Sequence, residues 1–215
     1  MNTPKIQLAK FNENDLLKKF LNNEEAFESF DNVVNSSLAL NREAYVGAID
    51  DTAAEGIETV IRYWNRIDDE AGIPIEDRKP IKLYIDSWGG LQVGAYTIIN
   101  AIELSKTPVW TINIGAAYSA GFFIFITGHK RFAYPLSSFL YHEGSTGGDG
   151  FEDAHKFRNR AAFYEKQLGQ LKNHVLKYTK ITEEEYQKII KDDYWLTASE
   201  ALEKGICDEI AKEFV

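Results

Sequence analysis

The chain has 215 residues, of which 44% are hydrophobic and 27% are charged, and its formal net charge at pH 7 is -9. This length and composition are typical of one folded domain with a sizeable apolar core, and they argue against extensive disorder. The acidic balance, without any basic stripe, argues against nucleic-acid binding. The single cysteine, Cys207, cannot form an internal disulfide and lacks the neighbours of a zinc site, so we expect it to be a small buried residue.

The N-terminal part of the chain differs in composition from the rest. It is polar, rich in Asn and Glu, and lacks the apolar core of a signal peptide. We interpret residues 1–42 as an N-terminal arm, in which Asp15 can cap a short helix, and residues 43–215 as one domain. No apolar run reaches the length of a membrane span, about 18 residues. We therefore expect a cytoplasmic protein without a membrane partner.

Hydrophobic periodicity predicts that strands and helices alternate in the domain. In chain order we expect a strand over residues 43–50, a helix over 51–72, a strand over 81–86, a helix over 91–105, a strand over 108–115, a helix over 119–127, strands over 130–135 and 137–142, helices over 152–179 and 181–193, and a last short helix and strand. The strands over 81–86 and 108–115 are almost continuous apolar runs. Such runs are typical of a parallel α/β sheet with helices on both faces.

Apolar stripes and capping residues define the predicted helices. The residues expected on these stripes are Ile57, Val60, Ile61, Trp64, Val93, Tyr96, Ile99, Ala101, Ile102, Phe157, Ala161, Tyr164, Leu168, Leu171 and Val175. Thr182 and Glu185 have the spacing of a capping box. The last helix begins at a Thr or Ser cap and ends at Gly205.

Ser119 is a hydroxyl residue in the apolar stretch "INIGAAYSAGFFIFITG", at a predicted strand-to-helix junction. Active sites of parallel sheets lie at such junctions, where free amide groups and the helix dipole favour negative charge. A nucleophilic serine needs a base, for which His142 is a candidate, and the base needs an orienting carboxylate, of which Asp193 is one of several. Alternatively, Ser119 only caps a buried helix and His142 is bonded to backbone.

The segment "DSWGG" at residues 86–90 is a second candidate element of a site. Two adjacent glycines after a strand allow the backbone to approach a ligand closely. A tight strand-to-helix turn without further function is the alternative.

Four stretches taken together resemble the proteolytic subunit of the Clp protease family (ClpP). They are "LYIDSWGG", "IGAAYSAG", "FLYHEGSTGG" and "DDYWLTASEALEKGICDEI", in this order along the chain. The resemblance extends over about residues 43–211. It implies an α/β fold of the ClpP/crotonase type, with a parallel sheet core and a protruding handle helix at about residues 144–178. It also implies a serine endopeptidase that hydrolyses unfolded proteins.

The resemblance implies a role for each matching residue. Ser119 is the nucleophile, His142 the general base and then general acid, and Asp193 the residue that orients His142. The backbone amides of Gly90 and Ala120 form the oxyanion hole. The residues implied for the substrate groove are Trp88, Gly89 and Gly144.

The resemblance also implies an assembly and a partner. Two stacked heptameric rings enclose the active sites, and a hexameric ATPase unfolds proteins and threads them in. The chain has no phosphate-binding GxxxxGK[ST] loop, so ATP is used only by this partner. We expect neither a metal nor a cofactor in the chain itself.

Several residues, among them Trp88 and Tyr118, depart from the family pattern and keep other functions open. Trp88 stands where the family has Pro, and Tyr118 where it has a small residue. One alternative is a structural or weakly active subunit that assembles with an active paralogue. Another is a phage capsid-maturation protease that works without an ATPase. The crotonase fold of coenzyme A hydratases is a third, but it does not need a Ser-His-Asp set.

Overall fold

A computed structural model of the protein describes residues 37–144 and 153–215. The chain divides into two compact units, Met1–Asn41 and Arg42–Val215. In the first unit the described residues form a single helical turn over residues 37–40. The helix cap expected at Asp15, and the rest of the arm up to residue 36, lie outside the described residues. So do residues 145–152 of the glycine-rich loop.

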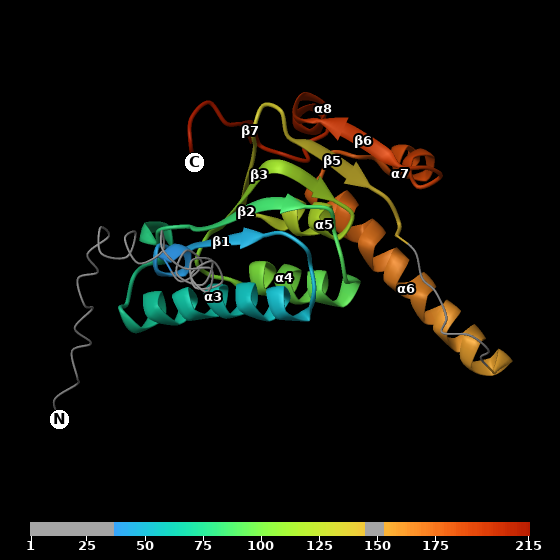
Figure 1. Cartoon of the computed structure of the whole chain (residues 1–215), viewed down its shortest axis with the longest axis horizontal. Coiled ribbons are helices and arrows are strands. Elements are labelled where there is room, and N and C mark those ends of the chain that lie inside the picture. Colours follow the sequence, from blue (N-terminus) through green and yellow to red (C-terminus); the bar gives the residue numbers. More distant parts are fainter. Residues whose placement is uncertain (1–36, 145–152) are drawn as a thin grey trace, which may run out of the picture. The chain divides into compact units, whose positions relative to one another are not determined.

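A mostly parallel sheet forms the centre of the second unit (Figure 1). Its strands are β1 (Glu43–Val46), β2 (Ile81–Ser87), β3 (Val109–Tyr118), β4 (Lys130–Ala133), β5 (Ser138–Tyr141), β6 (Tyr194–Thr197) and β7 (Glu209–Ile210). The order β1-β2-β3-β4-β7 is parallel throughout, and β5 pairs in parallel with the end of β3. Only the pair of β5 and β6 is antiparallel among the described strands. The predicted α/β class is confirmed.

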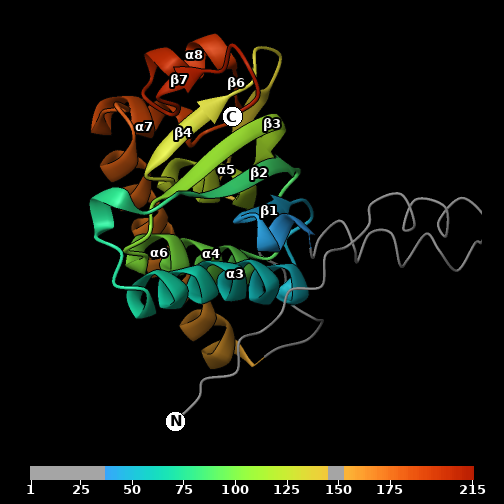
Figure 2. The ribbon, with the colours of Figure 1, turned by 90° about the vertical axis from the view of Figure 1, so that its left-hand side faces the viewer.

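The helices follow the strands in the predicted alternation. They are α3 (Asp51–Glu70), the 3-10 turn η1 (Ile75–Asp77), α4 (Gln92–Leu104), α5 (Ala120–Thr127), α6 (Ala154–Tyr178), α7 (Glu183–Ile189) and α8 (Ala198–Glu203). Helices α3, α4 and α5 lie on the same side of the strands β1 to β3 (Figure 2). All eight residues of α5 are buried, which explains why this helix is apolar on every side.

Burial along β2 differs from the prediction that helices cover both faces of the sheet. Ile81, Leu83 and Ile85 are fully buried, whereas the alternate residues are half-buried or exposed. Because successive side chains of a strand point to opposite faces, β2 is covered on one face only. The continuous apolar run in the sequence was therefore a poor guide to the second face, where Lys82 and Tyr84 lie.

Caps define the ends of the last two helices. Thr197, not Ser199, caps α8, and it forms a complete capping box with Glu200. The Thr182 hydroxyl accepts from the Glu185 amide at the start of α7, as predicted. The Glu185 carboxylate, however, binds Lys204 instead of closing the box.

Two of the predicted apolar stripes extend beyond the core. Only Leu171 and Val175 of α6 are buried, while Phe157 is 57% exposed in the part of the helix that leaves the sheet. In α4, Val93 is 66% exposed, so its predicted place in the core is wrong. Cys207 is 1% exposed, as predicted, and burial raises the pKa of its thiol to about 11. Within the described residues, no helix is long and apolar enough to span a membrane.

Candidate active site

Ser119 has an unusual backbone conformation. It stands between the end of β3 and the start of α5, with φ 53° and ψ -121°. Among the described residues only Arg42 is another non-glycine residue with positive φ. Such a conformation costs about 1–3 kcal/mol and is concentrated at functional sites. A nucleophilic serine of the α/β-hydrolase type stands on a similarly strained strand-to-helix turn.

The Ser119 side chain does not cap α5, although the residue is at the N-cap position. The alternative of a merely capping serine is therefore wrong. The turn is held by its backbone instead: the Ser119 amide donates to the Leu140 carbonyl at 2.9 Å, and the Ser119 carbonyl accepts from the Phe122 amide at 3.0 Å. These bonds leave the Ser119 hydroxyl free of a structural role in the turn.

Of the two glycines after β2, Gly89 is adjacent to Ser119 and Gly90 is adjacent to the backbone of Ile49. Gly89 and Gly90 have φ of 103° and 149°. A Cβ on Gly89 would lie 2.7 Å from the Ser119 Cβ, and a Cβ on Gly90 would lie 2.1 Å from the Ile49 carbonyl oxygen. The bridge to Ile49 uses the Gly89 carbonyl and the Leu91 amide, so the Gly90 amide is not part of it. Both positions require glycine, which explains the "GG" of the sequence.

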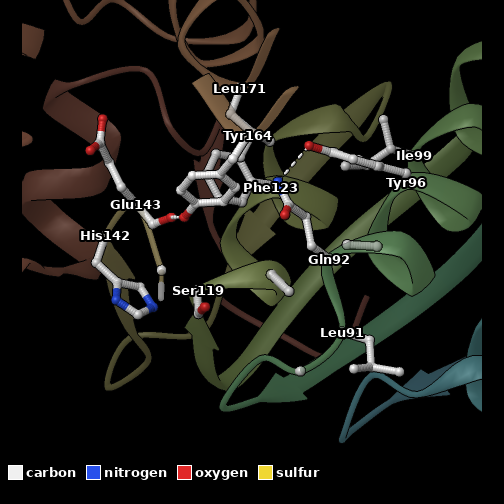
Figure 3. A pocket seen from close by; sticks show the side chains of 14 residues that line it. Leu91, Gln92, Tyr96, Ile99, Ser119, Phe123, His142, Glu143, Tyr164 and Leu171 are labelled. Atoms are coloured by element: carbon white, nitrogen blue, oxygen red, sulfur yellow. Dashed lines mark hydrogen bonds between the residues drawn. The ribbon is translucent and has the colours of Figure 1, made fainter. Parts of the chain in front are cut away.

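A cavity of about 270 Å³ opens beside Ser119 (Figure 3). Five of the predicted site residues line it: Gly90, Ser119, Ala120, His142 and Gly144. The remaining walls are mainly apolar and come mostly from α4, α5 and α6, together with Leu91 before α4 and Glu143 after β5. Concave, mostly apolar cavities with a few convergent polar groups are the usual form of ligand sites.

His142 directly follows β5, and its imidazole is turned toward Ser119 in Figure 3. The register of the next strand pair brings in Asp193. Tyr141 of β5 is opposite Tyr194 of β6, so one further step of this antiparallel pair makes His142 and Asp193 neighbours. Ser119, His142 and Asp193 are thus brought together by the adjacent strand ends of β3, β5 and β6.

The Asp193 carboxylate is not hydrogen-bonded to His142 within the described residues. Asp193 is exposed, and its amide donates to the carboxylate of Asp192 at 2.8 Å. The strand register thus makes Asp193 a neighbour of His142 without a hydrogen bond. Hydrogen bonds of catalytic groups are often long in the free enzyme and tighten with substrate.

Sequence reasoning missed polar groups in the cavity wall. The Gln92 side-chain amide donates to the Tyr96 hydroxyl at 2.6 Å, and the Tyr164 hydroxyl donates to the Glu143 carbonyl at 3.2 Å. Burial, with a contribution from Glu165, raises the pKa of the Glu143 carboxyl. Gln92 and Tyr96 are one helical turn apart, and this spacing is the signal that could have identified the pair.

The remaining predicted groove residues lie close to Ser119. Gly89 contacts it as described, and Gly144 has φ 77° at the cavity rim. Trp88 is 80% exposed, and its ring packs against Tyr118. No group of three His, Cys, Asp or Glu residues in the described parts of the chain could hold a metal ion. A hydroxyl, an imidazole and backbone amides at one cavity are suited to acyl transfer.

Comparisons with known proteins agree with this chemistry. The family model described as Clp protease matches residues 44–214. The ATP-dependent Clp protease proteolytic subunit 2 of Treponema pallidum is 33% identical over 137 residues, which are 63% of this chain and 68% of that protein. The protein of the same name from Treponema denticola is 34% identical over 136 residues, covering 62% and 67%. The one from Borreliella burgdorferi is 31% identical over 144 residues, covering 64% and 70%.

Proposed function

The chain belongs to the Clp protease family, and on that premise we propose that Ser119, His142 and Asp193 are its catalytic triad. The observation that carries this proposal is the strained turn that presents the Ser119 hydroxyl to the cavity beside His142. The strand register that makes Asp193 a neighbour of His142 supports the third assignment. The chain is a serine peptidase of the ClpP type. The proposed triad would supply the nucleophile, the base and the orienting carboxylate for hydrolysis of peptide bonds.

The proposed reaction begins with attack of the Ser119 Oγ on the carbonyl carbon of the scissile bond. His142 accepts the hydroxyl proton as the new C–O bond forms, and Asp193 orients the imidazole. The amides of Gly90 and Ala120 bind the oxyanion. His142 then gives its proton to the leaving amine, and an acyl-enzyme remains on Ser119. Water, activated by His142, hydrolyses this ester and restores the free serine.

The substrate residue that carries the attacked carbonyl needs space for its side chain next to Ser119. Gly90 and Ala120 both line the cavity, so the side chain of this residue enters the cavity between α4, α5 and α6. The apolar walls favour an apolar side chain, and the Gln92–Tyr96 pair offers a polar contact at its end. This mechanism uses only side chains and backbone amides and needs no cofactor.

We further propose that the substrates are unfolded polypeptides and that the chain acts in an oligomeric barrel. The relatives are named as subunits of ATP-dependent proteases, which supports a partner ATPase for this chain as well. Two stacked heptameric rings and a hexameric unfoldase are the assembly that we propose, in the cytoplasm. The comparisons favour neither a purely structural subunit nor a capsid-maturation protease.

Active-site labelling tests the nucleophile. The purified protein is treated with a fluorophosphonate, and the adduct is located by mass spectrometry. We expect one adduct, on Ser119, and none in Ser119→Ala. The matched control is Ser199→Ala, which removes an exposed serine at the start of α8. A folded, oligomeric protein without an adduct would contradict the proposal.

The two adjacent carboxylates offer a matched test of the third residue. Asp192 and Asp193 are both exposed and one residue apart, but only Asp193 continues the register toward His142. We expect Asp193→Asn to lower kcat for a peptide by about two orders of magnitude or more, because the imidazole loses its orienting partner. Asp192→Asn should retain most of the activity. The reverse result would assign the role to Asp192.

A further inference from the structure

Three aromatic rings form a continuous row beside Ser119, which we call the aromatic ladder: Trp88, Tyr118 and Trp195. The ring centroids of Trp88 and Tyr118 are 5.3 Å apart at an interplanar angle of 76°. Those of Tyr118 and Trp195 are 5.2 Å apart at 81°. Both contacts are edge-to-face, the arrangement that aromatic pairs prefer.

The ladder combines a fixed centre with two exposed ends. The Tyr118 hydroxyl is 2.7 Å from the Ser138 Oγ, which fixes the central ring on the neighbouring strand. Trp88 is 80% exposed and Trp195 is 54% exposed. Clustered exposed aromatic rings are unusual on a protein surface and are typical of binding sites, whereas single exposed apolar residues need no explanation.

Each member of the ladder is attached to a part of the active site. Trp88 precedes the glycine turn, and Tyr118 precedes Ser119 in the chain. Trp195 of β6 is opposite Leu140 of β5, whose carbonyl holds the Ser119 amide. The ladder is therefore continuous with the site of the proposed reaction, and a peptide bound there would reach it.

The ladder and the cavity lie on opposite faces of the sheet. Ala117, Phe139 and Leu196 are paired across β3, β5 and β6 and are buried in the core under the helices. Their chain neighbours Tyr118, Leu140 and Trp195 are paired in the same way and must point to the other face. The cavity includes residues of the helices that cover the first face. Ser119 lies between the ladder and the cavity.

This placement assigns the two surfaces to different parts of a substrate. Gly90 and Ala120, whose amides form the proposed oxyanion hole, line the cavity, so the residue with the attacked carbonyl occupies the cavity. The chain beyond the scissile bond then passes Ser119 toward the other face. We propose that the aromatic ladder binds an aromatic or large aliphatic side chain in the substrate segment that follows the scissile bond, an inference that rests on the proposed function.

Two quenched fluorogenic peptides test whether the ladder binds a substrate side chain. The two peptides are identical before the scissile bond and carry either Phe or Ser in the two positions after it. For the unmodified protein we expect kcat/KM to be roughly 3- to 10-fold higher for the Phe peptide, the effect of one aromatic contact. Trp88→Ala and Trp195→Ala should bring this ratio close to one, and Trp88→Phe should retain part of it.

The control is Trp110→Ala, because Trp110 packs on Phe132 and is in contact with neither the cavity nor the ladder. Trp110→Ala should give the same ratio of kcat/KM values for the two peptides as the unmodified protein. If Trp88→Ala and Trp195→Ala both label on Ser119 and cleave peptides but keep the kcat/KM ratio of the unmodified protein, the proposed role of the ladder is wrong. The proposed function is not affected by that result. A change of oligomeric state in Trp88→Ala would also overturn the proposed role of the ladder, because it would make the ladder a subunit interface. An unmodified protein that neither labels nor cleaves would overturn the proposed function, and the ladder with it.

Discussion

Replacing Ser119 by glycine is expected to stabilise the fold while it removes the proposed nucleophile. The backbone at this position has φ 53° and ψ -121°, a conformation that costs a residue with a Cβ about 1–3 kcal/mol. Glycine adopts this backbone conformation without strain, but its greater conformational freedom in the unfolded chain reduces the gain in stability by about 0.4–1 kcal/mol. Relative to Ser119→Ala, which keeps the Cβ and lacks the hydroxyl, the free energy of unfolding should rise by about 1 kcal/mol.

Thermal unfolding of the two variants at equal protein concentration measures this difference. Equal concentration is needed because assembly shifts apparent stability by mass action. For a chain of this size, 1 kcal/mol corresponds to about 2–4 °C in Tm. Both variants should lack peptidase activity. If the Tm of Ser119→Gly is equal to or lower than that of Ser119→Ala, the positive φ of residue 119 stores no strain. The turn then does not hold the serine in an unfavourable backbone conformation.

Three further changes have defined expected outcomes. Gly90→Ala should lower kcat by about 10²–10³ in a peptide assay, because the new Cβ would lie 2.1 Å from the Ile49 carbonyl oxygen and displace the proposed oxyanion donor. Tyr186→Phe should lower the free energy of unfolding in urea by about 1–3 kcal/mol, because the Tyr141 hydroxyl, 2.6 Å from that of Tyr186, is left buried without its partner. Burial lowers the pKa of His174, so in acid the unfolded chain binds a proton that the folded chain does not, and stability should fall as the pH drops below about 6.5.

Matched variants separate these effects from general damage. Gly56→Ala, where no atom lies within 4 Å of the new Cβ, should leave kcat unchanged. The pH dependence of stability should be shallower in His174→Gln but unaltered in His155→Gln, which changes an exposed histidine of the same helix. An equal slope in the His174 variant, or an activity loss in the Gly56 variant, would contradict the corresponding reasoning.

Most of the elements could be predicted because their sequence patterns directly reflect burial. Ile57 and Ile61 repeat at helical spacing and face the core, and the short apolar runs become β2 and β3. The sequence pattern does not indicate where the apolar stripe of a helix extends beyond the elements that the helix packs against. Val93 lies in the first turn of α4 and Phe157 near the start of α6, and both are exposed although each fits its stripe.

The candidate site was only partly accessible to sequence reasoning. The junction at Ser119 and the glycine turn are local features, and glycine at 89 and 90 marks the close approach that the structure contains. The positive φ of Ser119 has no signal in its own residue type. Contacts between Tyr118 and Trp195 depend on the register of strands that are far apart in sequence, and no periodicity encodes that register.

The edge position of β6 has a consequence for how the enzyme loses activity on warming. Within the described sheet, β6 pairs only with β5, through four residue pairs, and lies off the main strand order. An edge segment held in this way opens locally at lower free energy than the whole domain. Its opening would carry Asp193 and Trp195 away while the parallel strands remain intact. With Asp193 in its proposed role, we expect heat inactivation to begin reversibly, some degrees before the domain melts.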